Sequence, residues 1–191
     1  IATAACIREE ILVKGLVPEE RISVVGEWAA NGFFDLSSKE KYRQDVRHEF
    51  EVASDRPLVC VVGMLRGDKA QEVLIETVAE LKRRGRDVVA LIVGSGTNSQ
   101  SDYDHRLRLL ADRLGVREQI RFTGYRDDIP RLTQACDAQV ITSISVEAQS
   151  RAVPQAFASM TPVVASRVGG IEELVKDRYY GRLVGIKDVT A

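Results

Sequence analysis

The feature that most constrains the fold of this chain is an alternation, from Pro57 onward, of short apolar runs with longer amphipathic stretches. Short apolar runs are typical of parallel strands that are buried on both faces, and the amphipathic stretches are typical of the helices that cover them. The alternation therefore predicts an α/β fold with a doubly wound, mostly parallel sheet. The expected strands are LVCVVG (58–63), DVVALIVG (87–94), QIRFTG (119–124), AQVITS (138–143), PVVAS (162–166) and, as a sixth candidate, GRLVG (181–185).

The stretches between these runs show the spacing of amphipathic helices. Leu74, Val78 and Leu81 recur on one helical face between the first two strands, while the charged residues fall elsewhere. The stretch between the second and third strands has the same pattern. A glycine follows each of the two expected helices, at the position where a helix often ends in a left-handed conformation. The second apolar set is Leu107, Leu110, Ala111 and Leu114, and the two glycines are Gly85 and Gly115.

Residues 1–55 contain too few apolar positions to form a core of their own. They hold a helix-like segment at 7–13, a short apolar run at 21–25 and a polar stretch from 37 to 56. We interpret them as the end of another domain and an interdomain linker with one strand and two helical pieces. This linker is expected to pack on residues 56–191, which we interpret as one domain without its closing helices, or on a part of the protein outside this chain.

The composition excludes several classes of function. The 27 basic and 28 acidic residues give a net charge of -1, so the chain has no general attraction to nucleic acid or to an acidic membrane face.

Cys6, Cys60 and Cys136 lack metal-ligand spacing, and we interpret them as reduced core thiols of a cytoplasmic protein. No apolar stretch reaches the roughly 18 to 20 residues that span a bilayer. The start, IATAACIREE, resembles no signal peptide and lacks an initiator Met, which fits a part of a longer protein.

A ligand of an open parallel sheet binds at the carboxyl ends of the strands, where loops and helix amino termini converge. The loop after the first expected strand, GMLRGDK (63–69), places Arg66 and Lys69 three residues apart before a helix. Arginine offers a planar fork to phosphate oxygens and lysine a mobile point charge. The loop therefore favours a phosphate site, although a solvated helix cap would explain the same residues.

The loop after the second strand, GSGTN (94–98), is short and built of small residues. Gly94 and Gly96 allow positive φ angles and close approach of a ligand to the backbone. The loop has neither the GxGxxG pattern of dinucleotide-binding folds nor the GK[ST] of a P-loop, which disfavours both classes. A plain strand-to-helix turn remains the alternative interpretation.

The loop after the third strand offers a surface for a flat nucleobase. Gly124 is followed by Tyr125 and Arg126, so an aromatic ring, a cation and free main-chain groups lie at one strand end. Main-chain donors and acceptors can pair with a base edge without particular side chains. Asp127 or Asp128 is expected to cap the following helix as well.

The fourth loop leads into a helix through the segment EAQSRAVPQ (147–155). Glu147 precedes the helix, and its amino terminus, expected near 150–152, offers free N–H groups to an anion. Glu147 and these amides would face the same ligand. The alternative is that Glu147 is a first-turn charge favoured by the helix dipole and that Gln155 is a surface residue.

Taken together, these segments resemble the donor domain of the retaining family 4, or group 1, glycosyltransferases, which have the GT-B fold. They occur in the order typical of that family, and the segment 7–25 resembles the last helix and strand before the interdomain linker. The resemblance implies a Rossmann-like sheet flanked by helices, which is one half of a GT-B fold. The segments that carry it are VVGMLRGDK (61–69), LIVGSG (91–96), IRFTGYRDDIPRL (120–132), EAQSRAVPQ (147–155) and TPVVASRVGGIEELV (161–175).

The resemblance assigns roles by position. Arg66 and Lys69 match the basic pair that holds the donor diphosphate, and Glu147 matches the first acid of an E-x7-E motif that contacts the donor sugar. Gln155 replaces the second acid, which binds the ribose, and glutamine both accepts and donates hydrogen bonds. The candidate catalytic residues are therefore Arg66, Lys69 and Glu147, and the candidate donor-binding residues are Gly63, Gly94, Gly96, Tyr125, Arg126, Ser150, Arg151 and Gln155.

Three further departures from the family pattern concern the loops. Met64 stands where many members have arginine, a loss for which Arg66 would compensate. Ala70 replaces the usual glycine, and Thr97 a common proline. Such departures, with Gln155, support an alternative hypothesis, a catalytically silent scaffold that keeps the fold. A third hypothesis is a sugar epimerase or phosphorylase of similar fold, which the order of the loops disfavours.

The resemblance also implies a reaction. A sugar would pass from a nucleoside diphosphate to an acceptor with retention at the anomeric carbon, without a metal or other cofactor. The acceptor and a catalytic histidine would belong to an amino-terminal domain absent from this chain, so the chain alone would be inactive. His48 and His105 are expected to face solvent instead. The partners would be the donor and that domain, with no nucleic acid, in the cytoplasm or peripherally at the inner membrane face.

Overall fold

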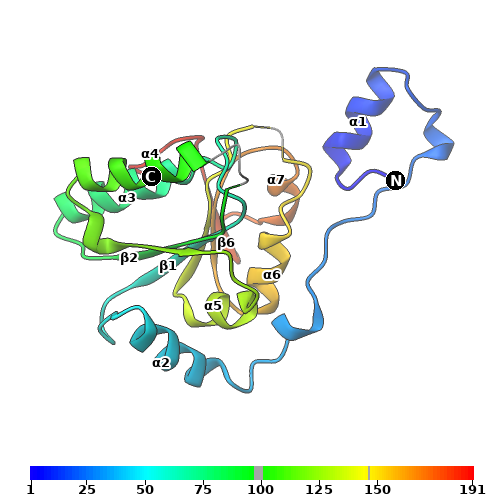
Figure 1. Cartoon of the computed structure of the whole chain (residues 1–191). Helices are drawn as coiled ribbons and strands as arrows, with labels where there is room; N and C mark the ends of the chain where they lie inside the picture. The colour runs from blue at the N-terminus through cyan, green and yellow to red at the C-terminus, as the bar shows by residue number, and fades with distance from the viewer. Residues whose placement is uncertain (97–100, 146) are drawn as a thin grey trace.

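The computed structural model describes residues 1–96, 101–145 and 147–191. Six parallel strands form one sheet in the order β3-β2-β1-β4-β5-β6 (Figure 1). All six expected runs form strands, including the sixth candidate, and the α/β prediction is confirmed. The bounds are β1 Leu58–Val62, β2 Val89–Val93, β3 Ile120–Gly124, β4 Ala138–Ile141, β5 Val163–Ser166 and β6 Gly181–Val184.

The central strands β1 and β2 are apolar throughout because helices cover both faces of the sheet there. All five residues of β2 are buried. Ala90 and Ile92 belong to one core cluster while Val89, Leu91 and Val93 belong to another, as expected when successive side chains point to opposite faces. Each pair of neighbouring strands has a parallel register, for example Leu58 with Val89. Burial on both faces explains why β1 and β2 lack the polar alternation of exposed strands.

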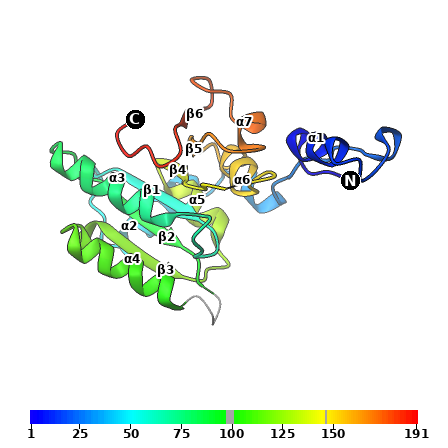
Figure 2. The same cartoon turned by 90° about the horizontal axis from the view of Figure 1, so that it is seen from above.

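The helices divide into two layers. The first layer holds α3 (Gln71–Arg83) and α4 (Ser101–Arg113), which lie side by side over β1 to β3 (Figure 2). The opposite face is covered by α2 (Lys39–Glu49), α5 (Ile129–Ala135), α6 (Ala152–Ala158) and α7 (Ile171–Leu174). Short 3-10 helices occur at Glu19–Arg21, Asn31–Phe33 and Arg117–Gln119. Gly85 and Gly115 have φ angles of 73° and 67°, so both predicted left-handed caps are confirmed.

The strand order reverses between β1 and β4. The chain builds β1, β2 and β3 outward in one direction and then returns to place β4 on the other side of β1. The carboxyl ends of β1 and β4 therefore diverge into loops that leave in opposite directions, which opens a crevice there.

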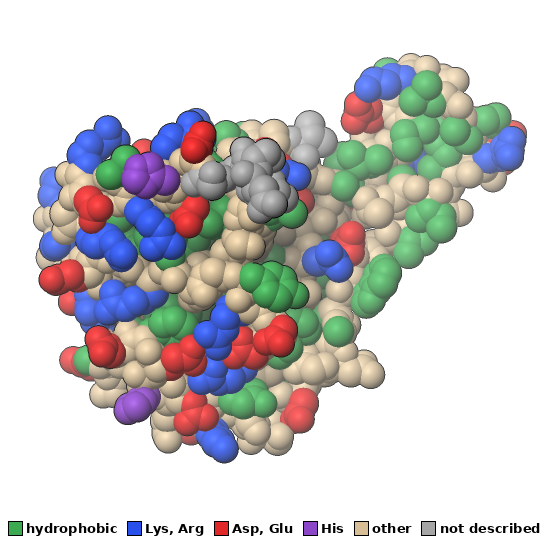
Figure 3. All heavy atoms as spheres, in the orientation of Figure 1, with side chains coloured by type: hydrophobic (Ala, Val, Ile, Leu, Met, Phe, Trp, Pro, Cys, Tyr) green, Lys and Arg blue, Asp and Glu red, His purple; other side chains and the backbone are tan. Residues whose placement is uncertain are grey.

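The amino-terminal segment projects from this body. Helix α1 (Ala5–Val13) stands apart and is joined to the rest by an extended segment (Figure 1), and apolar side chains cover much of the projecting lobe (Figure 3). The N–H groups of Ala5 and Cys6 donate to the Glu173 carboxylate of α7 at 2.9 and 3.0 Å, which ties α1 to the body. The exposed apolar residues include Val13, Leu16, Val24, Val25 and Trp28.

Two expectations for this part of the chain were wrong. The strand expected at 21–25 does not form: Val24 makes a single parallel bridge with Ala2 and finds no third strand to extend the pairing. Cys6 is only half-buried and so is not a core thiol, whereas Cys60 and Cys136 are buried in one core cluster.

Helix α2 packs closely on the sheet although its sequence is polar. Its Arg47 side chain is 7% exposed and donates to the backbone oxygens of Ala53 and Arg56 and to Asp137. Asp137 also accepts from the N–H of Leu58 at 2.7 Å, at the start of β1. One buried guanidinium thereby joins α2, the turn that follows it and the sheet, so α2 packs on residues 56–191.

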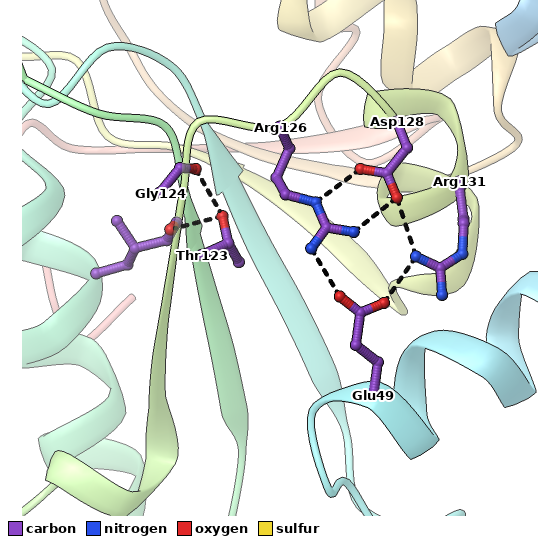
Figure 4. Close-up of polar contacts among 7 residues, drawn as sticks. Glu49, Thr123, Gly124, Arg126, Asp128 and Arg131 are labelled. Atoms are coloured by element: carbon purple, nitrogen blue, oxygen red, sulfur yellow. Dashed lines mark hydrogen bonds and ion pairs between the residues drawn. The ribbon is translucent and has the colours of Figure 1, made fainter.

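A four-residue ionic network joins the end of α2 to the loop after β3 (Figure 4). Arg126 donates to Asp128 and to Glu49, and Arg131 donates to the same two carboxylates, at distances of 2.7 to 2.9 Å. The hydrogen bonds from Arg126, and then from Arg131, lower the pKa of Asp128 to about 2. Asp128 occupies the position before α5, but its side chain caps no helix N–H. The expected cap is therefore wrong, because the two arginines engage the carboxylate instead.

Replacing Arg47 tests how α2 is anchored. Arg47→Met keeps most of the apolar stem but removes a buried guanidinium that donates to the Ala53 and Arg56 oxygens and to Asp137, so we expect a loss of about 2 to 3 kcal/mol in the free energy of unfolding. Arg43→Met is the matched control, since Arg43 contacts the same Asp137 from a more exposed position and should lose about 0 to 1 kcal/mol. Urea unfolding measures both, and equal losses would contradict the anchoring role.

The network also predicts a dependence of stability on pH. The pKa of Asp128 lies below its ordinary value, so its stabilising contribution is fully present above about pH 4 and is lost as the pH falls toward 2. Wild-type protein should therefore lose more stability between pH 5 and pH 2.5 than Asp128→Asn does. Asp112→Asn, on the exposed face of α4, serves as the control. Parallel urea-unfolding profiles for wild type and Asp128→Asn would contradict this prediction.

Candidate functional site

A cleft of about 700 Å³ opens at the carboxyl ends of β1, β2 and β4, where the strand order reverses. Its floor is formed by strand ends and its walls by the four loops singled out in the sequence. It holds nine of the eleven candidate site residues. These are Gly63, Lys69, Gly94, Tyr125, Arg126, Glu147, Ser150, Arg151 and Gln155; Arg66 and Gly96 do not line it.

Glycines allow the strand ends to approach one another closely. A Cβ on Gly94 would lie 1.9 Å from the carbonyl oxygen of Gly63, and Gly94 has a φ angle of 138°. The N–H of Gly94 donates to the oxygen of Gly124 at 2.9 Å. No side chain therefore projects from Gly63 or Gly94 where these two strand ends meet, which leaves room for a ligand beside the main chain. Thr97 lies outside the described residues, so its departure from the family pattern has no structural outcome here.

Lys69 and Glu147 form the ionic centre of the cleft. The Lys69 ammonium donates to Glu147 Oε2, and the hydroxyl of Ser143 donates to the same oxygen at 2.9 Å. The Lys69 side chain is 24% exposed and that of Glu147 is 15% exposed. Thr142 donates its hydroxyl to the backbone oxygen of Lys69 at 2.6 Å. The loops after β1 and β4 are thus joined through both the backbone and the side chain of Lys69.

Arg66 lies outside the cleft. Its guanidinium makes a two-pronged contact with Asp68 at 2.5 Å, and its side chain is 46% exposed. This hydrogen-bonded pairing raises the pKa of Arg66 and lowers that of Asp68. The structure therefore separates the predicted basic pair, and Met64 lines the cleft on this side without a charge.

The backbone conformation of Ala70 explains why the family pattern usually has a glycine at this position. Its φ angle is 48° and its ψ angle is 49°, in the left-handed region, and the residue is fully buried. A residue with a Cβ adopts this conformation at a cost of about 1 to 2 kcal/mol. The backbone that links Lys69 to α3 therefore keeps the shape that glycine would favour.

Tyr125 and Arg126, the aromatic and cationic residues after β3, both line the cleft but differ in their exposure and side-chain contacts. Tyr125 is 79% exposed. Arg126 is held by Asp128 and Glu49, and these contacts raise its pKa. Its charge is therefore already balanced by carboxylates.

The segment after β4 supplies the remaining wall. Ser150 and Arg151 precede α6, which starts at Ala152, close to the expected start at 150–152. Gln155 faces the cleft from the first turns of α6, so it is not an outer-surface residue. Arg151 is exposed and makes no ion pair with any residue of 1–96, 101–145 or 147–191.

Sequence reasoning missed Glu27 and Gln149. Glu27 belongs to the extended segment after α1, and its N–H donates to Gln149 Oε1 at 2.9 Å. A Cβ on the neighbouring Gly26 would lie 3.1 Å from the same oxygen, so a larger residue there would require the Gln149 side chain to shift. No local signal in the sequence shows that this segment returns to the cleft. Ser143, in contrast, stands in the polar loop that the sequence had singled out.

Other expectations concern residues outside the cleft. His48 and His105 are exposed, as expected. In the part of the chain that the structure describes, no group of three or more His, Cys, Asp or Glu residues is arranged to hold a metal ion. No helix in these segments is long and apolar enough to cross a membrane.

The chain is similar in sequence to longer proteins that transfer sugars. The alpha-D-kanosaminyltransferase of Streptomyces kanamyceticus is 30% identical over 93% of this chain and 44% of its own length. The D-inositol 3-phosphate glycosyltransferase of Nocardia farcinica is 35% identical over 74% of this chain and 32% of its own. The chain thus spans less than half the length of these relatives.

Solved structures show the same partial coverage. HepE of Anabaena, in complex with UDP and glucose, superimposes with a TM-score of 0.85 and 27% identity over 98% of this chain and 49% of HepE. Its complex with UDP-glucose gives a TM-score of 0.83 over 96% of this chain. The six-stranded parallel sheet with its helices thus matches one half of a GT-B fold. The model of the family "Glycosyl transferases group 1" matches residues 43–191, and the chain belongs to that family.

Proposed function

We propose that this chain binds the nucleoside diphosphate sugar that serves as donor in a glycosyl transfer. The observation that supports this most directly is the Lys69–Glu147–Ser143 cluster in the cleft lined by Gly63 and Gly94, at the point where the strand order reverses. A cation for phosphate and a carboxylate for sugar hydroxyls thus lie within one cleft. HepE, a relative of the same fold, has been solved with UDP and glucose and with UDP-glucose.

Lys69 is the proposed ligand of the diphosphate. In the unliganded protein its charge is balanced by Glu147, and donor binding would bring phosphate oxygens into competition for the ammonium. Negative charge grows on the diphosphate as the glycosidic bond breaks, so a fixed cation stabilises the transition state more than the ground state. Arg66 would join Lys69 by leaving Asp68, since its side chain lies at the surface and is free to rearrange.

The rest of the cleft would hold the other parts of the donor. Glu147, once it shares Lys69 with the diphosphate, accepts hydrogen bonds from sugar hydroxyls. Gln155 hydrogen-bonds the ribose, and the turn at 124–126 receives the nucleobase. Ser150 and Arg151 lie beside the sugar and phosphates. Gly96 would allow the loop after β2 to approach the donor.

The complete reaction needs more than this chain. We propose that the acceptor binds to another domain of a longer enzyme, since the chain spans about half of HepE. Transfer would proceed with retention and without a metal, as the family resemblance implies, and the chain alone would be inactive. The buried thiols of Cys60 and Cys136 fit a reducing compartment, the cytoplasm, with peripheral attachment to the inner membrane face for the longer protein.

A second candidate, a catalytically silent module that binds the nucleotide sugar, is favoured by one observation. The cleft side formed by the loop after β1 presents the uncharged Met64, while Arg66 is paired with Asp68 outside the cleft. The two functions make different predictions for the longer protein. An enzyme transfers the sugar or hydrolyses UDP-glucose slowly, whereas a silent module binds UDP-glucose without turnover.

Donor binding is tested by isothermal titration calorimetry with UDP, GDP and ADP and with their glucose conjugates. The chain should bind at least one of these nucleoside diphosphates together with its glucose conjugate. The nucleoside diphosphate alone should supply most of the affinity of the conjugate. Heat changes indistinguishable from dilution for all of them would remove the proposal.

Lys69→Ala should weaken the binding of the diphosphate. Loss of one charge-assisted contact costs about 1.5 to 3 kcal/mol, which corresponds to roughly a 10- to 150-fold rise in Kd. Arg66→Ala should have a smaller effect, because Arg66 must first leave Asp68. The matched control is Lys82→Ala, since Lys82 lies at the far end of α3 and donates to Gly115. Similar Kd values for Lys69→Ala and Lys82→Ala would contradict the assignment.

The ribose contact of Gln155 is tested with a second nucleotide. If Gln155 binds the ribose diol, the wild-type chain should prefer UDP over 2′-deoxy-UDP by about fivefold, equivalent to one hydrogen bond of roughly 1 kcal/mol. Gln155→Ala should bind both nucleotides with nearly the same Kd. A preference that survives in Gln155→Ala would show that another group binds the hydroxyl.

A further inference from the structure

Arg126 lines the donor cleft, yet its charge is already committed. Nε and Nη2 donate to the two oxygens of Asp128 at 2.8 Å each, and Nη1 donates to Glu49 at 2.7 Å. With Arg131, the network holds two cations and two anions, so its net charge is zero. Arg126 therefore brings no unbalanced positive charge to a diphosphate in the cleft.

The acids of the network come from different parts of the chain. Asp128 is two residues from Arg126 and would restrain the turn only locally. Glu49 lies 77 residues away, on the last turn of α2, and gives one carboxylate oxygen to Arg126 and the other to Arg131 (Figure 4). Burial alone would raise the pKa of Glu49, but the hydrogen bonds from both arginines outweigh it and lower that pKa. Glu49 is thus the tether between the turn and α2.

The turn is held from its other side by the sheet. The carbonyl oxygen of Gly124 accepts from the N–H of Gly94 and from the hydroxyl of Thr123, both at 2.9 Å. The backbone of Tyr125 therefore lies between two fixed points, the strand end at Gly124 and the Arg126–Glu49 contact. Glu49 itself does not line the cleft.

We propose that Glu49 is a positioning residue that acts through Arg126: it fixes the turn at 124–126 in the shape that receives the nucleobase. The inference rests on the proposed donor function and deepens it by dividing the affinity between two parts of the cleft. The loops after β1 and β4 hold the diphosphate, and the tethered turn holds the nucleoside. Loss of Glu49 then affects the nucleoside contribution and leaves the diphosphate contribution intact.

Other contacts hold α2 in place near Glu49, so a substitution of Glu49 should change the structure only locally. Helix α2 stays anchored through Arg47 and Asp137, and Val46 packs in the same core cluster as Leu132 of α5. Glu49→Gln removes the carboxylate charge, which leaves one unbalanced arginine at the edge of the cleft. It also weakens the tether, because an amide offers one neutral acceptor oxygen in place of two charged ones.

The experiment compares UDP with inorganic pyrophosphate as ligands of the same chain, by calorimetric titration. Glu49→Gln should weaken UDP binding by roughly fivefold, within the range of mutations that act through a second residue, and leave the Kd of pyrophosphate unchanged. Glu40→Gln is the matched control on α2, because Glu40 is exposed and contacts Gln44 alone among the described residues. It should change neither Kd, and urea unfolding checks that all variants remain folded.

Glu49→Gln/Arg131→Gln is a second variant that restores a zero net charge without restoring the tether. It should remain weak for UDP, and it replaces the single variant if that variant fails to fold. Tighter binding of both ligands by Glu49→Gln would overturn the inference, because it would show Arg126 to be a phosphate ligand that Glu49 neutralises. Equal weakening of both ligands, or no change in either, would overturn it too. If the wild-type chain binds GDP or ADP instead of UDP, that nucleotide takes the place of UDP in this comparison. Failure to bind UDP, GDP and ADP alike would instead remove the proposed function, and this inference with it.

Discussion

Burial of the parallel sheet on both faces is the constraint on which the rest of the structure depends. Strands such as β2 have no polar face, so groups that do chemistry are displaced to the loops at the strand ends. The reversal of strand order beside β1 then opens one of these edges into a cleft. The close contact of Gly63 and Gly94 leaves no room for a side chain at Gly94, where two strand ends meet in that cleft. The position of the site thus follows from how the core is covered.

Charge balance is the second organising principle of the cleft. Lys69 is paired with Glu147, Arg66 with Asp68, and the two arginines of the network with two carboxylates. A donor diphosphate would therefore reach Lys69 and Arg66 by exchanging partners with existing ion pairs. Such exchange limits the gain in affinity from these two cations, because each gives up a contact to make a new one. Arg151, which makes no ion pair with any described residue, would give up none. The exchange at Lys69 also positions Glu147 to turn from Lys69 to the sugar when the phosphates arrive.

The sequence predicted what depends on local pattern. Periodicity located all six strands, and the capping rule located Gly85 and Gly115 in left-handed conformations. The loops that follow the strands contained most of the cleft lining, because strand ends meet at one edge whatever the side chains. Features set by distant partners could not be predicted. Asp128 does not cap α5 because it accepts from Arg126 and Arg131, which also donate to Glu49 on α2. Glu27 reaches the cleft because the extended segment after α1 passes beside it. Arg66 illustrates the same limit, since its pairing with Asp68 depends on the side-chain conformation and not on its place in the motif.

The decisive measurement for the proposed donor site is a crystal structure of the chain with UDP-glucose. We expect the diphosphate within hydrogen-bond distance of Lys69, the base against the turn at 124–126, and Glu147 in contact with a sugar hydroxyl. The proposed site is contradicted if UDP-glucose occupies a different surface, or if it lies in the cleft with its phosphates away from Lys69 and the Lys69–Glu147 pair unchanged.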